Sequence, residues 1–158
     1  MTDLASYTMS NTPMYSFVNK KVWARVLCVH DGDTMTCAIE AFPKCFFRYN
    51  VRLDGIDTKE ITSHDPATKA CAMSARNELL NYVTSGKFIA TAPHSRNDII
   101  NELANDVHLV FLHCDKMDKY GRILAVVYKA PDDEESINTI LINKGLAVKY
   151  DGGKKTDW

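Results

Sequence analysis

Two alternating runs separated by an Asp-Gly pair constrain the fold of this chain more than any other feature of its sequence. Residues 22–28 alternate in side-chain character, and a second alternating run extends over residues 33–39. Because successive side chains of a strand point to opposite faces, such runs are typical of half-buried β-strands. Asp31-Gly32 between them is a strong signal for a tight hairpin turn. The folded part of the chain is therefore predicted to begin with a β-hairpin.

The sequence predicts three further strands. A third alternating run ends at Gly55, and one of its faces is formed by Phe47, Tyr49, Val51 and Leu53. Two apolar, β-branched runs over residues 107–114 and 123–128 flank a charged turn and predict a second hairpin. Arg122 begins the last strand, and the residues that share its phase are Leu124, Val126 and Tyr128. We therefore expect Arg122 to point with the core residues.

The first predicted helix follows these three strands. Asp65-Pro66 is a good helix start, since Asp is a favoured N-cap and Pro is favoured at the first helical position. The helix should run to about Val83, before Gly86. Its core face is predicted from helical spacing to contain Ala67, Ala70, Cys71, Leu79, Leu80 and Val83.

Two shorter helices are predicted further along the chain. The segment between Phe88 and Asp106 contains Pro93, a possible cap at Ser95 and a short apolar stripe, which together indicate a small helical excursion. The last helix should cover residues 137–144 and end before Gly145, because glycine is common just after a helix.

The order of these elements predicts the fold class. Three strands, a helix, two strands and a final helix suit an antiparallel, partly open, five-stranded Greek-key barrel, the oligonucleotide-binding (OB) fold, which is a mainly β, α+β architecture. Two to three helices would cover it. The predicted organisation is a flexible N-terminal arm over residues 1–20, one folded domain over residues 21–150 and a mobile C-terminal tail over residues 151–158.

Composition excludes several classes of protein. The chain is 46% hydrophobic and 25% charged, as globular domains are, and no window approaches the roughly 18 apolar residues that a membrane span needs. Its formal net charge of −1 predicts that any binding of phosphate is local. The 5 cysteines are never spaced as Cys-x-x-Cys, so we expect buried, reduced thiols. Without a signal-peptide pattern at its start, the chain is expected to be intracellular.

Two aspartates of the first hairpin differ in their expected surroundings. Asp31 is expected to face water in the turn. Asp33 falls in phase with the apolar residues Met35, Cys37 and Ile39. A charge on that face is costly unless it is compensated. Asp33 therefore needs a cation, and an arginine and a metal ion are equally compatible with the pattern.

The end of the third strand concentrates further charge. Parity places Arg52 on the polar face, where it could be a solvated arginine paired with Asp54. The turn that follows presents Asp57 and Glu60 three residues apart, close enough to converge on one ion.

Four short motifs resemble those of the staphylococcal (thermonuclease-like) nuclease family, in the order found there. The resemblance covers roughly residues 22–150. The motifs are Asp31-Gly32-Asp33-Thr34, Arg52-Leu53-Asp54-Gly55-Ile56-Asp57, Glu60 and Asp118-Lys119-Tyr120-Gly121-Arg122. The family has the OB-fold barrel with covering helices that the order of elements also predicts.

The resemblance implies roles for nine residues. The carboxylates of Asp33 and Asp57, with the backbone carbonyl of Thr58, would bind Ca²⁺. Glu60 would be the general base. The residues implied to contact the substrate are Arg52 and Arg122 at the scissile phosphate, Lys119 and Tyr120 near a terminal phosphate, and Tyr150 packed on the substrate.

The charges agree with a metal-dependent reaction on nucleic acid. Asp33, Asp57 and Glu60 would repel a phosphodiester, two arginines leave one negative charge, and a divalent cation reverses the sign. Oxygen ligands without histidine or thiolate favour Ca²⁺, or alternatively Mg²⁺ or Mn²⁺. The resemblance implies hydrolysis of DNA and RNA with little sequence preference. Neither a membrane nor an obligate protein partner is expected from the sequence. The alternative is an inactive OB-fold module that binds nucleic acid or protein, as in tudor-nuclease scaffolds.

Overall fold

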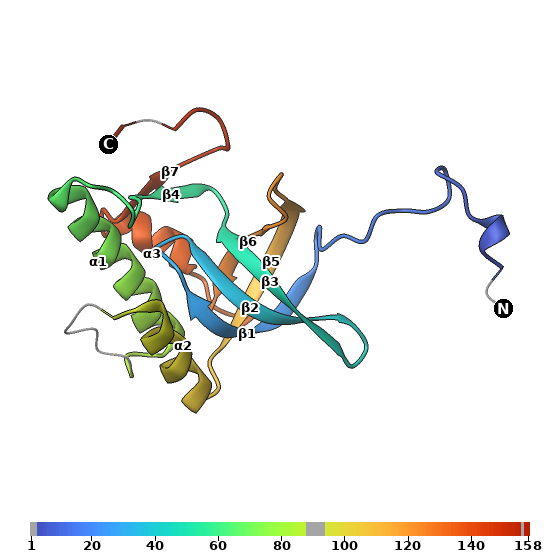
Figure 1. Cartoon of the computed structure of the whole chain (residues 1–158), viewed down its shortest axis with the longest axis horizontal. Coiled ribbons are helices and arrows are strands. Elements are labelled where there is room, and N and C mark those ends of the chain that lie inside the picture. The colour runs from blue at the N-terminus through green and yellow to red at the C-terminus, as the bar shows by residue number, and fades with distance from the viewer. Residues whose placement is uncertain (1–2, 88–93, 156) are drawn as a thin grey trace.

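A closed five-stranded β-barrel forms the centre of the computed structural model, which describes residues 3–87, 94–155 and 157–158 (Figure 1). The strands follow one another around the barrel in the order β1-β2-β3-β6-β5. Their bounds are β1 Lys21–Val29, β2 Thr34–Phe42, β3 Cys45–Leu53, β5 Leu109–Met117 and β6 Ile123–Tyr128. The predicted five-stranded, OB-type α+β fold is confirmed.

The barrel closes through a parallel pair of strands. β3 and β6 run parallel, with Arg52 opposite Leu124, whereas the other four pairs are antiparallel. The prediction of a partly open, antiparallel set is wrong in this respect. A parallel pair needs a long crossover connection, and the helices and β5 between β3 and β6 provide it.

A second, two-stranded sheet joins the middle of the chain to its C-terminal part. β4 (Ile56–Thr58) pairs antiparallel with β7 (Ala147–Lys149), and Tyr150 N extends the pairing by donating to Gly55 O at 2.9 Å. Strands of three residues are too short for alternation to reveal them, which is why the sequence predicts only a turn after β3. This small sheet places the C-terminal segment beside Asp57.

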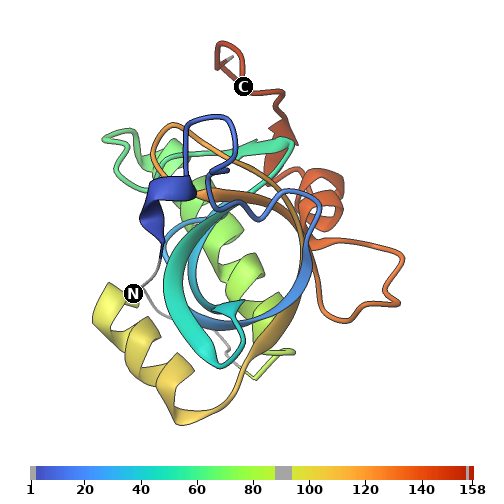
Figure 2. The ribbon, with the colours of Figure 1, turned by 90° about the vertical axis from the view of Figure 1, so that its right-hand side faces the viewer.

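Three helices cover the barrel. α1 (Pro66–Val83) begins at Asp65, whose side chain accepts from Thr68 N at 2.8 Å. α2 (Arg96–Asn105) begins with a capping box of Ser95 and Asp98, and α3 (Ile137–Asn143) follows β6. Figure 2 looks into the barrel and shows α1 crossing behind it. The predicted helices are confirmed, while residues 88–93 of the expected excursion, Pro93 among them, lie outside the described residues.

Close packing fixes the β1–β2 turn against α1. A Cβ atom added at Gly32 would lie 2.5 Å from Ala75 Cβ and 2.9 Å from Thr58 Cγ2. Real Cβ contacts are never so short, so a residue without a side chain is required at this point. The turn that carries Asp31 and Asp33 is therefore anchored between the first helix and β4.

The face of β6 that enters the core differs from the predicted one. Ile123, Ala125 and Val127 are buried completely, whereas the residues in phase with Arg122 are only half-buried. The expectation that Arg122 points with the core is therefore wrong. β6 is apolar on both faces because its outer face meets α3, so alternation alone could not identify the inner one.

The helix and cysteine predictions also need correction. On α1, Ala67 and Ala70 are exposed and Cys71 is half-buried, because the core contact begins only at Ala72. Of the five cysteines, all free, Cys45 is exposed where the β2–β3 hairpin turns. The remaining ones with buried side chains are Cys28, Cys37 and Cys114. None of the helices in the described ranges is long and apolar enough to cross a membrane.

The N-terminal arm leaves the barrel at Phe17. Residues 3–14 are exposed and extend away from the barrel in Figure 1, whereas Tyr15 packs on Phe42 and its hydroxyl donates to Ala41 O at 2.6 Å. Phe17 itself is fully buried, and its ring lies 4.9 Å from that of Tyr49 in an edge-on contact. The chain is therefore anchored in the core four residues before β1 begins.

Candidate active site

A buried arginine holds two carboxylates together at one end of the barrel. Arg52 Nη2 donates to Asp33 Oδ2 at 3.2 Å and to Asp57 Oδ1 at 3.0 Å, while its Nη1 donates to Ile56 O at 3.1 Å. All three charged residues are at least nine-tenths buried. The alternative of a solvated Arg52 paired with Asp54 is therefore wrong.

Strand pairing accounts for the meeting of Asp33 and Arg52. The antiparallel register of β2 and β3 places Thr34 opposite Arg52, and Leu53 N donates to Asp33 O at 2.8 Å. The carboxylate of Asp33 also accepts from Thr34 Oγ1 at 2.9 Å and from Thr58 N at 3.3 Å. The prediction that Asp33 lies on the buried face and needs a cation is confirmed, and an arginine supplies that charge.

Asp31 also belongs to this site, although the sequence predicts that its side chain faces water. Its Oδ1 accepts from Asp33 N at 3.1 Å, and the residue is half-buried rather than exposed. Burial first, and then the negative charges of Asp33 and Glu60, raise the pKa of Asp31 to about 7. The expectation that Asp31 faces water is wrong because the turn packs against α1 at Gly32.

Glu60 lies after β4 and meets a lysine from the far end of the chain. Lys155 Nζ is 2.8 Å from Glu60 Oε1 and 3.0 Å from Asp57 Oδ1. Although burial acts to lower it, the hydrogen bonds to Glu60 and Asp57 raise the pKa of Lys155 overall. The Glu60 side chain is 62% exposed, so it is accessible to water and to a ligand.

Arg122 lies on the β5–β6 turn, which Asp118 makes rigid. Asp118 Oδ1 accepts from the backbone N–H groups of Tyr120 and Arg122, and Asp118 Oδ2 is 2.6 Å from Arg122 Nε. This ion pair uses only Nε. Within the described part of the chain, no residue accepts from the two Nη groups of Arg122, so they are available to an anion.

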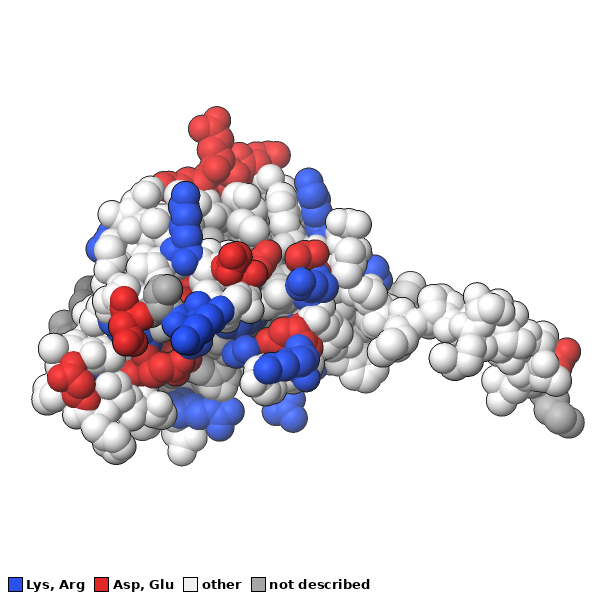
Figure 3. Space-filling view, turned by 90° about the horizontal axis from the view of Figure 1, so that it is seen from above, with Lys and Arg blue, Asp and Glu red and all other residues white. Residues whose placement is uncertain are grey.

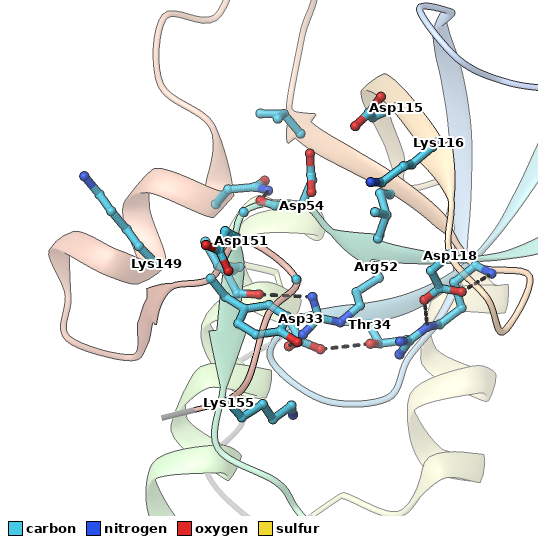
Figure 4. A pocket seen from close by; sticks show the side chains of 18 of the residues that line it. Asp33, Thr34, Arg52, Asp54, Asp115, Lys116, Asp118, Lys149, Asp151 and Lys155 are labelled. Carbon is cyan, nitrogen blue, oxygen red and sulfur yellow. Dashed lines mark hydrogen bonds and ion pairs between the residues drawn. The ribbon is translucent and has the colours of Figure 1, made fainter. Parts of the chain in front are cut away.

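One open cleft of about 1630 Å³ connects these groups. In Figure 4, Asp33, Thr34 and Arg52 form the centre of the view, Lys155 lies on one side and Asp118 on the other. Asp57 and Thr58 line the smaller pocket next to it, which shares Glu60 and Lys155 with the cleft. The predicted site residues that line the larger cleft are Asp33, Arg52, Glu60, Lys119, Tyr120, Arg122 and Tyr150.

The predicted substrate-contacting residues surround the two arginines. The ring of Tyr150 lies 5.3 Å from the guanidinium carbon of Arg52. Tyr120 is 71% exposed, and its ring lies 5.1 Å from Lys119 Nζ and 5.4 Å from the guanidinium carbon of Arg122. A planar ring therefore accompanies each arginine, an arrangement suited to a ligand that carries both phosphates and bases.

The donor set fits a hard divalent cation with few protein ligands. Asp33 and Asp57 both reach one nitrogen of Arg52, so their carboxylates lie close together, and all nearby donors are oxygens. Among the residues that the structure describes, no three Asp, Glu, His or Cys side chains form a ready cage for a metal. Such a cation would keep much of its coordination for water and for the ligand.

Charges of both signs are mixed on the surface around the cleft. The space-filling view in Figure 3 shows lysine and arginine side chains interspersed with acidic ones rather than one continuous basic face. This distribution agrees with the formal net charge of −1. Cations that could contact a polyanion are nevertheless present in the cleft, Arg52 and Arg122 among them.

Fold and site together define the class of this protein as an OB-fold domain with an arginine and carboxylate cleft at one end of the barrel. A family model described as staphylococcal nuclease homologue matches residues 50–157, more than half of the chain. The chain therefore belongs to the staphylococcal nuclease homologue family. A comparison with curated proteins gives no match. The matched range includes Arg52 and Glu60 but not Asp33, which accepts a hydrogen bond from Arg52.

Two residues of the cleft were missed by sequence reasoning. The sequence places Lys155 in the predicted mobile tail, because no periodicity links it to Glu60, 95 positions earlier. Asn138, at the start of α3, is buried; its side-chain amide donates to Asp54 O at 2.8 Å and to Ala125 O at 3.2 Å, and its carbonyl accepts from Val127 N at 3.0 Å. These hydrogen bonds join the end of β3 to β6 behind Arg52. The only sequence signal for this role is a polar residue on an otherwise apolar face of the helix.

Proposed function

We propose that this protein is a metal-dependent nuclease that hydrolyses phosphodiester bonds of DNA and RNA with low sequence specificity. One observation carries the proposal: Arg52, fixed by Asp33 and Asp57, shares an open cleft with Glu60 and Arg122 in a member of the staphylococcal nuclease homologue family. Each of these residue types matches a requirement of phosphodiester hydrolysis.

The two arginines would bind the scissile phosphate. A guanidinium group offers paired N–H donors that match phosphate oxygens, and the free Nη groups of Arg122 provide such a pair. Lys119 and Tyr120 at the rim of the cleft would contact a neighbouring phosphate and base. Contacts to phosphates carry no sequence information, which accounts for the low specificity that we propose.

Glu60 would act as the general base. Its exposed carboxylate would take a proton from a water molecule that attacks phosphorus in line with the leaving oxygen. Arg52 and Arg122 would stabilise the negative charge that develops on the phosphate oxygens. Bound by Asp33, Asp57 and the carbonyl of Thr58, a Ca²⁺, Mg²⁺ or Mn²⁺ ion would supply further positive charge at the same phosphate.

The non-cutting scaffold is a poorer explanation of the same cleft. A barrel that only binds nucleic acid or protein needs neither a base nor clustered carboxylates, which repel a polyanion. Here Glu60, Asp33 and Asp57 lie within one site, and Arg52 is committed to holding two of them. Clustered carboxylates of this kind can serve hydrolysis of a phosphodiester, whereas they would weaken simple binding of nucleic acid.

Cleavage assays with a charge-matched pair of variants test the proposal. Plasmid DNA and RNA would be incubated with Ca²⁺, Mg²⁺, Mn²⁺ or EDTA. We expect cation-dependent cleavage by the wild type and a loss on the order of a hundredfold or more in Glu60→Gln, because general bases contribute about 10² to 10⁴. Glu102→Gln makes the same change on the exposed surface of α2 and should cleave normally.

Two results would contradict this function. Equal cleavage by the wild type and Glu60→Gln would exclude the proposed base. Tight binding of DNA or RNA without cleavage under every cation would support the scaffold instead.

A further inference from the structure

The C-terminal segment, of which the structure describes residues 150–155 and 157–158, forms a wall of the candidate active site. Tyr150 packs on Arg52, and Lys155 is hydrogen-bonded to Asp57 and Glu60. Further along, the ring of Trp158 lies 4.5 Å from Lys59 Nζ, between the same two acids in the sequence. Three successive contacts of this segment therefore fall on the stretch from Arg52 to Glu60.

A hydrogen-bonded turn at residues 150–153 positions Lys155 at the site. Tyr150 is tied to Gly55 by the backbone bond that extends the β4–β7 pair. Tyr150 Oη then donates to Gly153 O at 2.8 Å, and Gly153 N donates to Asp151 Oδ1 at 3.0 Å. Gly152 takes the left-handed conformation, with φ +89°, that turns the chain back. The turn is compact and places the lysines after it over the cleft.

Lys155 lies where a divalent cation bound at Asp57 would also need to lie. Asp57 Oδ1 lies 3.0 Å from Arg52 Nη2 and 3.0 Å from Lys155 Nζ, so one carboxylate oxygen already serves two positive groups. The same ammonium is 2.8 Å from Glu60. A divalent cation bound at Asp57 would lie close to the ammonium and repel it, because like charges at such distances are unfavourable.

We propose that the C-terminal segment is an internal ligand of this site, and that its Lys155 competes with the divalent cation for Asp57 while it also holds Glu60. The proposal rests on the proposed function, since it concerns the same cation. When the cation binds, Lys155 leaves and frees Glu60 to accept a proton. By linkage the effect is reciprocal: the docked segment weakens cation binding by the factor by which the cation weakens docking.

The competition has a readout that does not depend on cleavage. The chain has 2 Trp residues, and Trp158 lies on the docked segment while Trp23 lies on β1. In a Trp23→Phe background, the fluorescence of Trp158 reports the segment. We expect CaCl₂ to change it, and to cause no change once Lys155→Met has already released the segment.

Calorimetric titration of the full chain with CaCl₂ tests the competition directly. We expect Lys155→Met to bind Ca²⁺ at least about fivefold more tightly than the wild type, the lower end of typical coupling between sites. Lys154→Met is the matched control, because Lys154 is an exposed neighbour that forms none of the ion pairs found among the described residues. Its Ca²⁺ affinity should equal that of the wild type.

The possible outcomes separate this proposal from the proposed function. If the wild type and Lys155→Met bind Ca²⁺ equally and Asp57→Asn does not bind it, the cation site stands and the competition is overturned. If Lys154→Met gains as much affinity as Lys155→Met, a general charge effect replaces the specific contact. If no variant binds Ca²⁺, Mg²⁺ or Mn²⁺, the competition and the metal-dependent function both fail.

Discussion

Single residues of this protein combine structural and chemical roles, and Arg52 is the clearest case. Its guanidinium forms ion pairs with two buried carboxylates, and its side chain is only 9% exposed. Removing one partner of a buried ion pair is costly, on the order of 3–5 kcal/mol, because the other charge stays behind uncompensated. Loss of activity on replacing Arg52 would therefore mix misfolding with lost phosphate binding. Arg122, which is bound only through Nε, is the better position at which to test phosphate recognition.

At the same scale, Asp31 should make stability depend on pH. Its pKa is raised from 3.8 to about 7, so the folded protein binds a proton more tightly than the unfolded chain does. The resulting cost is absent below about pH 4, grows as the pH rises and is complete above about pH 7. We expect Asp31→Asn to be as stable as the wild type at pH 4 and more stable at pH 8, by on the order of 2–4 kcal/mol.

Urea denaturation of both proteins in EDTA at several pH values measures this difference, since all other titrating groups are shared. A stability difference that does not change between pH 4 and pH 8 would show that Asp31 keeps an ordinary pKa.

The elements of the fold show which signals are contained in the local sequence. Alternation places Asp33 among Met35, Cys37 and Ile39, and the N-caps at Asp65 and Ser95 fix two helix starts. The same alternation fails on β6, because both of its faces are covered. It also fails for the three-residue strands β4 and β7. Side-chain period and N-capping residues therefore predict elements that have one solvent-exposed face. For elements covered on both faces, the packing partners determine which face enters the core.

The site was only partly predictable for the same physical reason. Asp33, Arg52, Asp57 and Glu60 cluster near strand ends, where their motifs identify all four and alternation also places Asp33 on the buried face. Asp31 is half-buried because its turn packs on α1, and the β4–β7 pair brings Lys155 to the site. Neither contact leaves a local pattern, because each depends on segments far apart in the sequence.

Packing between elements yields a separate prediction at Gly32. We expect Gly32→Ala to destabilise the protein by about 1–3 kcal/mol, since its Cβ would clash with Ala75 Cβ and Thr58 Cγ2. Thermal unfolding measures the loss. The double variant Gly32→Ala/Ala75→Gly relieves the closer clash and should recover more stability than the two single changes predict when added. Simple additivity would show that the turn does not depend on this contact with α1.

At the scale of the whole molecule, a weakly acidic barrel brings positive side chains from distant parts of the chain into one cleft. The formal net charge is −1, and the surface in Figure 3 mixes both signs. Arg52, Arg122 and Lys155 come from three separate parts of the chain and meet in one cleft. A closed barrel makes this possible, because its β1–β2 and β5–β6 turns and the end of β3 lie at the same rim. We propose that a divalent cation joins the acids of this rim to form a cutting centre.

The crystal structure of Glu60→Gln with Ca²⁺ and a short oligonucleotide tests that claim most directly, because this variant should bind its substrate without cutting it. We expect density for the ion at the carboxylates of Asp33 and Asp57, and a phosphate between Arg52 and Arg122. An ion bound elsewhere, or an oligonucleotide bound on a face of the barrel away from Arg122, would contradict the account.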